Sequence, residues 1–410
     1  MDMSATRIAF GLAAILSGTT ICACLYARKL FQAPVVPRQV YPSDFALPKR
    51  SHFTKLLGTP TNVAYLVTGA SGFIAHYIVE QLLERGETTV YALDIRQPTI
   101  ALPKGAQFLH CDLTHLDSLK KTLQGKNIQV IYHVAAIIRF MDEFPEQLPL
   151  SYNINVTATE NVIQACLDLN IPFLVQTSTS HVSVGYDLDP IFYGNERLPY
   201  TEKPVNNYAQ TKVLAEKAIL AANGKKLQNG KTLHTASIRP ASIIYGFGDK
   251  WGLDTYFVTR DLQLHHHNIV DDFCYVENVA LAHLLLEKGL RENPGVVGGH
   301  PFLISHDDPL SRENFFTILE TLKPNYFTRS YIPYPILYIL SRIATFTTRY
   351  TTISLGDLDM YTACSDVLQS QQHCFSSLKA RKVLGYEPFY TVEQGVKLAW
   401  DRWEAAGNGL

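Results

Sequence analysis

The sequence predicts an α/β protein built on a doubly wound parallel sheet, and two observations lead to this prediction. A short apolar run at residues 63–67 ends at Thr68 and Gly69, and a helical apolar pattern begins around Gly72 and Ala75. From there on, short apolar runs alternate with amphipathic segments, as they do in successive βαβ units. A strand, a tight turn and a helix in this order bring a phosphate onto the N–H groups of a helix N-terminus.

The composition excludes several classes of protein. The chain has 410 residues, enough for two or three domains or for one large α/β domain with a cap. Its net charge is -1 and neither sign forms a long run, so we expect no nucleic-acid partner. The seven cysteines are scattered and contain no Cys-x-x-Cys pair. This argues against a disulfide framework and a zinc site, and favours a reducing compartment.

The N-terminal segment differs from the rest of the chain. Residues 8–26 contain no charged side chain and are long enough to span a bilayer, which predicts a transmembrane anchor within residues 1–30. A cleaved signal peptide is the alternative, because small residues lie near the end of this stretch. Arg28, Lys29 and Arg38 follow the span. The positive-inside rule therefore predicts a single-pass membrane protein with its folded domain in the cytosol, for example at the endoplasmic reticulum.

The remaining chain is expected to form two domains after a proline-rich linker at residues 31–60. A dinucleotide-binding Rossmann domain is placed at residues 61–245, and a smaller substrate-binding cap, partly interleaved with it, at residues 246–410. Residues 331–340 in the cap are apolar but too short to span a bilayer comfortably. They fit a pocket wall, a patch resting on a membrane, or core packing. Further strands are expected at residues 88–94, 107–112, 130–134, 172–177 and 235–240.

Two acidic residues end strands beside the glycine turn. Gly69 would supply a turn conformation that a Cβ disfavours, and Gly72 would let the backbone approach a phosphate. Asp94 ends the second strand, where a carboxylate accepts hydrogen bonds from ribose hydroxyls and favours NAD over NADP. A surface aspartate capping a turn is the other interpretation. Asp112 ends the third strand, where it either meets the adenine edge or caps a helix.

Tyr208 and Lys212 are separated by one helical turn, so a phenol and an amine face the same side of a helix. A nearby cation favours the phenolate and brings a tyrosine toward the range useful for proton transfer. Residues 177–180, Thr-Ser-Thr-Ser, end the fifth strand at the edge where such sheets bind ligands. A hydroxyl there could hold the reacting oxygen of a substrate, or the strand could simply fray into a polar turn.

Two further motifs are discounted. The three histidines at 265–267 are adjacent, so regular structure cannot direct all of them at one metal, and no metal site is predicted. Asn155 begins a glycosylation sequon, but it opens an apolar helix in a domain that we place in the cytosol. Occupancy by a glycan is therefore not expected.

Together these motifs resemble the extended short-chain dehydrogenase/reductase superfamily. The closer resemblance is to its 3β-hydroxysteroid dehydrogenase branch, which includes the sterol-4α-carboxylate 3-dehydrogenases. Two departures from the family pattern are visible: Ala75 replaces the usual third glycine, and the end of the fifth strand is shifted by one residue relative to Gly185. The N-terminal anchor is also not general to the family. Besides the glycine turn and the Tyr208–Lys212 pair, the resemblance rests on HVAA at 133–136, NVTATEN at 155–161, IRPASIIYG at 238–246, YVENVA at 275–280 and KARKVLGYEP at 379–388.

The resemblance implies specific roles for these residues. Tyr208 accepts the proton of a secondary alcohol, while Lys212 holds the nicotinamide ribose and stabilises the phenolate. Alignment on the strand makes Thr179 the hydroxyl that binds the reacting oxygen, alignment on Gly185 makes it Ser180, and we favour Thr179. The implied NAD contacts are Gly69, Ser71, Gly72, Phe73, Ile74, Asp94, Asp112, Leu113, Ala135, Tyr208, Lys212 and Pro240.

The sequence therefore predicts an oxidoreductase that uses NAD to oxidise the 3β-hydroxyl of a sterol, triterpenoid or related polycyclic terpenoid to a ketone. A carboxylate on the neighbouring carbon would be lost as carbon dioxide. An NADPH-dependent carbonyl reductase is the alternative within the superfamily, and Asp94 disfavours it. A sugar-nucleotide epimerase shares the expected fold, but an apolar cap and an anchor suit it poorly. The non-enzyme alternative is a membrane-tethered scaffold that binds the dinucleotide without turnover, but such a protein would not need Tyr208 and Lys212. The protein could also form a homodimer.

Overall fold

The computed structural model describes residues 37–139, 142–186, 190–264, 269–350, 362, 364 and 368–408. The predicted anchor, the first part of the predicted linker and the histidines at 265–267 lie outside these residues. Within the described ranges, none of the helices combines the length and the hydropathy needed to cross a membrane.

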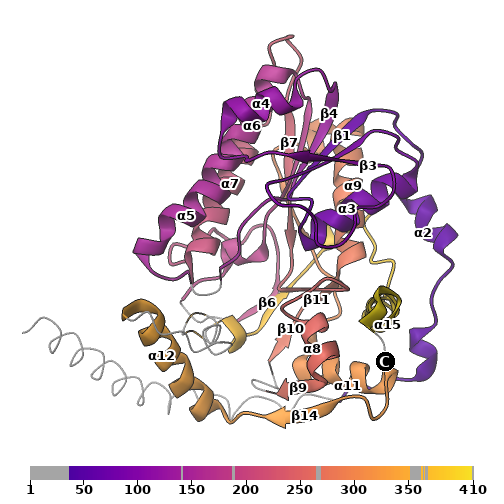
Figure 1. The fold of residues 1–410 in the computed structure, drawn as a ribbon, viewed down its shortest axis with the longest axis vertical. Helices are drawn as coiled ribbons and strands as arrows, with labels where there is room; N and C mark the ends of the chain where they lie inside the picture. Colours follow the sequence, from indigo (N-terminus) through magenta and orange to yellow (C-terminus); the bar gives the residue numbers. More distant parts are fainter. Residues whose placement is uncertain are drawn as a thin grey trace, which may run out of the picture.

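A seven-stranded sheet forms the centre of the molecule (Figure 1). All its neighbouring strands are parallel, and the winding direction reverses between β1 and β4, the kind of switch point where open α/β sheets bind ligands. The six strands expected from the sequence are present, so the prediction of a doubly wound parallel sheet is confirmed. The strand order is β12 (Pro301–Ile304), β7 (His234–Pro240), β5 (Phe173–Thr177), β4 (Ile128–His133), β1 (Ala64–Thr68), β2 (Val90–Asp94) and β3 (Ala106–His110).

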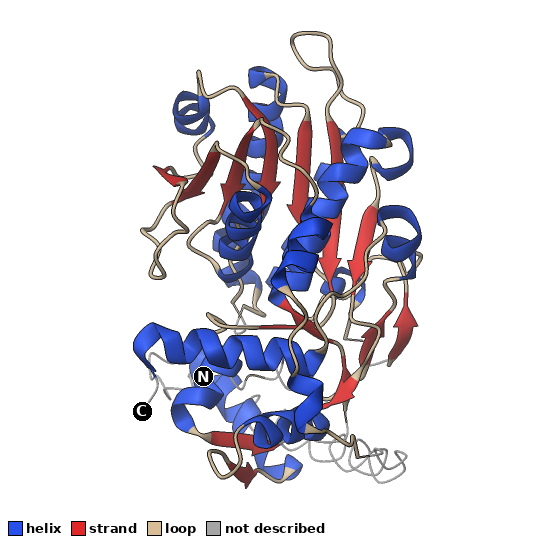
Figure 2. Cartoon of the chain, turned by 90° about the vertical axis from the view of Figure 1, so that its right-hand side faces the viewer, coloured by secondary structure: helices blue, strands red, loops and turns tan. Residues whose placement is uncertain are grey.

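Helices cover both faces of this sheet, as Figures 1 and 2 show. The alternation of side chains along β1 divides the core between the two faces. Tyr65 and Val67 pack into the apolar cluster beneath α3 (Phe73–Arg85) and α9 (Val276–Glu292), whereas Leu66 packs into a second cluster on the opposite face. The second cluster lies beneath α4 (Leu116–Leu123), α6 (Ala158–Leu169) and α7 (Asn207–Ala222).

The chain returns to the central sheet after residue 246. β12 pairs with β7, and α9 packs against α3, β5 and β7. Sequence periodicity did not predict β12, because four residues between irregular segments leave too short a pattern to recognise. Elements from both sides of residue 246 therefore build one core.

The other described elements form a smaller lobe beyond the ends of the strand arrows (Figure 2). It contains a four-stranded sheet, β13 (Leu310–Ser311), β10 (Val270–Asp271), β15 (His373–Phe375) and β6 (Ile191–Gly194). Two parallel pairs accompany it, β8 (Ile243–Tyr245) with β11 (Phe273–Tyr275) and β9 (Asp261–Leu264) with β14 (Thr328–Tyr331). Its helices include α8 (Leu253–Thr259), α11 (Arg312–Leu322), α12 (Tyr334–Tyr350) and α15 (Val392–Trp403). Further short helices of the described chain include α5 (Leu148–Tyr152), α10 (Pro294–Val297) and α14 (Leu378–Leu384).

The described part of the predicted linker, residues 37–60, is packed on the protein rather than acting as a free tether. Within it, α2 (Arg50–Leu57) buries Phe53 completely against the ring of Tyr390, 5.6 Å between centroids. Before the 3-10 turn η1 (Pro42–Phe45), Arg38 forms ion pairs with Asp308 and Glu393 of the smaller lobe. Proline content suggested a tether, but buried aromatic and ionic contacts fix this segment.

The apolar stretch at residues 331–340 divides between the end of β14 and the start of α12. Leu337 and Tyr338 are buried, whereas Ile336 and Ile339 are 52% and 49% exposed. The stretch therefore contributes to the core on one face of α12 and leaves apolar side chains in solvent on another.

Candidate active site

The turn between β1 and α3 brings two segments unusually close together. Gly69 has a left-handed φ of +71°, and a Cβ at this position would lie 2.7 Å from the Cα of Ala135. The Gly72 N–H donates to the Gly69 carbonyl at 2.8 Å, which closes the turn. Ala75 is fully buried in the core cluster beneath α3. Glycine at 69 and a small residue at 75 are thus steric requirements of this turn.

The N-terminus of α3 points its first N–H groups toward the turn. Gly72 is its N-cap residue, and the structure gives this N-cap no side-chain hydrogen bond. Phe73 and Ile74, the first two residues of the helix, are half-buried against the core. The N–H groups of a first helical turn have no partner within the helix and suit a phosphate.

Asp94 is held by the glycine turn itself. Its carboxylate accepts the Ser71 N–H at 3.0 Å and the Arg96 N–H at 2.9 Å, and the Ser71 hydroxyl donates to the Arg96 carbonyl. The carboxylate is only half-buried, so part of it remains accessible to a ligand. The turn and the acid are therefore one pre-organised unit.

The other predicted cofactor residues lie at the ends of neighbouring strands. Asp112 follows β3 and accepts hydrogen bonds from the N–H and hydroxyl of Thr114. Burial opposes ionisation, but these bonds and His115 lower the pKa of Asp112 overall. Leu113 is buried, and Pro240 is the buried last residue of β7.

Tyr208 and Lys212 lie one turn apart on α7 and are both buried. The Lys212 ammonium donates to the Thr177 carbonyl at the end of β5, 2.5 Å away. Burial lowers the pKa of Lys212 to about 8, although the Glu216 carboxylate opposes this shift. Burial raises the pKa of Tyr208 to about 12, and a hydrogen bond with Thr179 opposes that shift.

The two candidate hydroxyls differ in their contacts. Thr179 is hydrogen-bonded to Tyr208 and also accepts the His181 N–H at 3.2 Å. The Ser180 hydroxyl is buried and has no hydrogen-bond partner among the described residues. The structure therefore brings Thr179, rather than Ser180, to the phenol.

Asn155 was considered from the sequence as a glycosylation sequon and as the start of a family motif, but its contacts could not be predicted. Its side chain is 2% exposed and bonds Ile137 and Thr211, so the amide is not available to a glycan. It lies in a π-helical turn, Asn153–Thr157, immediately before α6. An asparagine at the start of an apolar helical segment could have indicated this structural role from the sequence, because a polar side chain buried there must be hydrogen-bonded.

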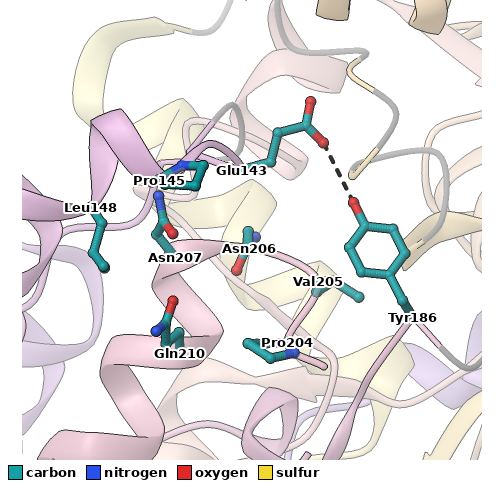
Figure 3. A pocket seen from close by; sticks show the side chains of 9 residues that line it. All are labelled: Glu143, Pro145, Leu148, Tyr186, Pro204, Val205, Asn206, Asn207 and Gln210. Carbon is teal, nitrogen blue, oxygen red and sulfur yellow. Dashed lines mark hydrogen bonds between the residues drawn. The ribbon is translucent and has the colours of Figure 1, made fainter. Parts of the chain in front are cut away.

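A cavity of about 270 Å³ opens beside the start of α7, as Figure 3 shows. The Tyr186 hydroxyl donates to Glu143 across it at 3.5 Å. Burial raises the pKa of Glu143, although hydrogen bonds from Thr345 and from the Cys364 backbone oppose this shift. Its lining residues are Glu143, Pro145, Leu148, Tyr186, Pro204, Val205, Asn206, Asn207 and Gln210.

These residues fit a dinucleotide and give no indication of a metal. The glycine turn leaves no room for a Cβ at Gly69, α3 presents an uncapped N-terminus, and Asp94 retains an accessible carboxylate. Over the described ranges, no group of three His, Cys, Asp or Glu side chains could hold a metal ion.

The turn, the acid that ends β2 and the buried Tyr208–Lys212 pair define the class of dinucleotide-dependent dehydrogenases and reductases. The chain belongs to the 3-beta hydroxysteroid dehydrogenase/isomerase family, whose sequence model matches residues 66–327. The resemblance predicted from the sequence is confirmed. Family membership also confirms the prediction of an NAD-dependent dehydrogenase.

Individual relatives agree with this membership. The chain is 31% identical over 361 residues to short-chain dehydrogenase/reductase family 42E member 1 of Macaca fascicularis, covering 84% of this chain and 88% of the relative. It is 31% identical over 352 residues to the decarboxylating sterol-4-alpha-carboxylate 3-dehydrogenase of Mus musculus, covering 81% and 88%.

Solved structures share the fold at low sequence identity. A UDP-galactose 4-epimerase aligns with a TM-score of 0.62 at 18% identity, covering 84% of this chain and 99% of that one. MoeE5 in complex with UDP-glucose and NAD aligns with a TM-score of 0.61 at 23% identity, covering 83% and 99%.

Proposed function

We propose that this protein oxidises the 3β-hydroxyl of a sterol, triterpenoid or related polycyclic terpenoid to a ketone, with NAD as the oxidant. The observation that carries the proposal is the contact of the Tyr208 phenol with Thr179, beside a lysine fixed to the end of β5. The sterol-4-alpha-carboxylate 3-dehydrogenase among its relatives supports this class of substrate.

The chain's own residues supply the proton chemistry. Tyr208 removes the hydroxyl proton of the alcohol, and the cationic form of Lys212 favours the phenolate that this step requires. Thr179 donates a hydrogen bond to the substrate oxygen as it becomes a carbonyl. Bound NAD supplies the acceptor for the hydride that leaves the carbon.

The same site allows a substrate with a carboxylate on the neighbouring carbon. Oxidation of such an alcohol yields a β-keto acid, which loses carbon dioxide without a further oxidant. The mouse relative is named as decarboxylating, which supports including this reaction in the proposal.

The proposal places the enzyme at a membrane. Residues 8–26 form an uncharged stretch long enough to span a bilayer, and the endoplasmic reticulum with a cytosolic domain remains our proposed location. The exposed isoleucines of α12 form a second apolar feature, in the lobe that we propose as the substrate-binding cap. A helix with one buried and one exposed apolar face suits the interface of a bilayer that holds the substrate.

The proposal is tested with the full-length protein in phospholipid vesicles containing NAD and 3β-hydroxysterols, with and without a 4-carboxylate. NADH formation measured by absorbance, together with a ketone identified by mass, is the expected result. The 4-carboxylate substrate should yield a ketone whose mass is lower than that of the β-keto acid by the mass of carbon dioxide. NADH formation from 3β-hydroxysterols that does not exceed the Tyr208→Phe background would reject the proposal.

A further inference from the structure

Five buried polar side chains form one hydrogen-bonded chain from the glycine turn to the active-site helix. Thr68, His133, Thr159, Asn155 and Thr211 are each 2% exposed or less. Thr68 Oγ1 lies 2.9 Å from His133 Nδ1, and His133 Nε2 lies 2.9 Å from Thr159 Oγ1. The chain thus crosses from β1 to β4 and on to α6.

The proton positions at His133 follow from its neighbours. The Thr159 hydroxyl donates to the Asn155 carbonyl at 2.7 Å, so it must accept the bond from His133 Nε2–H. His133 Nδ1 is then unprotonated and accepts the Thr68 hydroxyl. Burial, with a smaller effect of the Lys212 cation, lowers the pKa of His133 to about 3 and keeps the ring neutral. The hydroxyl protons of Thr68 and Thr159 and the ring proton of His133 are thus all donated in hydrogen bonds.

The first end of the chain holds the cofactor turn. The N–H groups of Val134 and Ala135 both donate to Thr68 Oγ1, at 3.2 and 3.3 Å. Ala135 is the residue against which Gly69 closes. Rotation of the Thr68 side chain about χ1 would move Oγ1 away from both N–H groups and release the segment that shapes the turn.

The second end holds the peptide group of Tyr208. The Asn155 amide donates to Thr211 Oγ1 at 3.0 Å. The Thr211 hydroxyl in turn donates to the carbonyls of Asn207 and Tyr208, at 2.8 and 3.0 Å. The start of α7 is thereby tied to the same chain as the glycine turn.

We propose that His133 is a positioning residue for hydride transfer, because one ring nitrogen bonds Thr68 beside the dinucleotide turn and the other bonds Thr159 of α6, from which hydrogen bonds continue through Asn155 to the Tyr208 helix. The inference rests on the proposed function, because the role given to His133 is to keep the nicotinamide of NAD aligned with the alcohol that Tyr208 deprotonates. Small displacements of reacting groups reduce rates by about tenfold to a hundredfold. His133 touches neither the alcohol nor the proton in this assignment.

The test uses Thr159→Val, which removes the acceptor for His133 Nε2–H, and His133→Asn, whose amide oxygen reaches Thr68 but not Thr159. Thr159→Ser retains the hydroxyl and should restore wild-type behaviour. The matched control is Thr235→Val: Thr235 is also fully buried and its hydroxyl also bonds a carbonyl of α7, at Ile219, far along the helix from Tyr208. Melting temperature, the NAD dissociation constant by calorimetry, kcat, KM and the deuterium isotope effect at the reacting carbon are measured for each.

The expected result is a kcat about tenfold to a hundredfold lower in Thr159→Val and His133→Asn, with a larger isotope effect and KM and NAD affinity nearly unchanged. Thr235→Val should lose comparable thermal stability while keeping the wild-type kcat and isotope effect. The inference is overturned if Thr159→Val and His133→Asn match Thr235→Val in all kinetic readouts. A wild-type protein that binds NAD but oxidises no 3β-hydroxysterol would instead overturn the proposed function.

Discussion

The Lys212 ammonium donates a hydrogen bond to the main-chain carbonyl of Thr177, 2.5 Å away. This bond ties the middle of α7 to the last residue of β5, two positions before Thr179. The phenol of Tyr208, one turn earlier on α7, is hydrogen-bonded to Thr179. Two side chains of α7, Tyr208 and Lys212, therefore contact the end of β5 and the residues that follow it.

Tyr208→Phe should lower kcat by about 10²–10⁴-fold, because it removes the group that takes the alcohol proton. NAD affinity should stay within about threefold, since the glycine turn and Asp94 are untouched. Steady-state kinetics and calorimetry check both statements. Tyr193→Phe, at an exposed position of β6, is the control and should behave as wild type. Turnover retained in Tyr208→Phe would exclude this tyrosine as the base.

Thr179→Val should lower kcat by about 10²–10³-fold, the usual effect of losing one donor to a developing oxyanion. Ser180→Ala should change it little, because the Ser180 hydroxyl has no partner among the described residues. Thr179→Ser, which keeps a hydroxyl, should recover most of the rate. Kinetics with a 3β-hydroxysterol measure all three variants, and a larger loss in Ser180→Ala would reverse the assignment.

Lys212→Met should inactivate the enzyme and remove one source of pH dependence from the stability of its fold. The pKa of Lys212 is lowered from 10.5 to about 8 in the folded protein, so below pH 8 both states are protonated and folding bears the full cost of burying the cation. Between pH 8 and pH 10.5, Lys212 is protonated in the unfolded state but neutral in the folded state, so the stability of the wild-type protein rises with pH. The free energy of unfolding of Lys212→Met relative to wild type should therefore fall by about 3 kcal/mol between pH 7 and pH 10.5, while loss of the hydrogen bond to Thr177 adds an offset that does not change with pH.

Urea unfolding of wild type and Lys212→Met between pH 6 and about 11 measures this difference. Lys288→Met, at an exposed position of α9, is the control for replacing a lysine with methionine. A stability difference that is flat with pH would contradict the lowered pKa.

Asp94→Ser should shift cofactor preference from NAD toward NADP. The carboxylate that would accept ribose hydroxyls is lost, and so is the charge that repels a 2′-phosphate. Loss of a hydrogen bond to a charged group predicts a KM for NAD about tenfold to a hundredfold higher. Asp94→Glu should keep most of the preference. The ratio of kcat/KM for the two cofactors is the measurement, and an unchanged ratio in Asp94→Ser would place the ribose elsewhere.

Replacement of Ile336, Ile339 and Ile343 with serine should raise KM for a sterol carried in phospholipid vesicles, but not for the same sterol in detergent. These residues are 52%, 49% and 41% exposed on α12, so their loss should cost the fold little. Val296→Ser is the control, because Val296 is 60% exposed on a different element, α10. Kinetics in vesicles and in detergent separate membrane contact from catalysis. An unchanged KM in vesicles for the triple variant would contradict a role of α12 at the membrane.

Much of the candidate site could be predicted from the sequence because its signals are local. The Gly69 turn is set by steric limits within a few residues, and helical periodicity alone places Tyr208 and Lys212 on one face. Asp94 could be placed because it ends a recognisable strand. Membership of the family followed from the order of such motifs along the chain.

Other features depend on residues that are far apart in the sequence and were decided only by the tertiary structure. β12 has too few residues to show a periodicity, and its place beside β7 comes from pairing across more than sixty residues. Phe53 and Arg38 fix a proline-rich segment through contacts with the C-terminal part of the chain. Hydrogen-bond geometry, not spacing, distinguishes Thr179 from Ser180.

The sequence by itself determined the doubly wound sheet, the dinucleotide turn and the tyrosine–lysine pair, because short-range sterics and periodicity specify them. Only the tertiary structure showed that His133 bonds Thr68 beside that turn with one ring nitrogen and Thr159 of α6 with the other. A buried neutral histidine takes its role from which atoms meet each ring nitrogen, and Thr68 and Thr159 meet it through the packing of β1, β4 and α6.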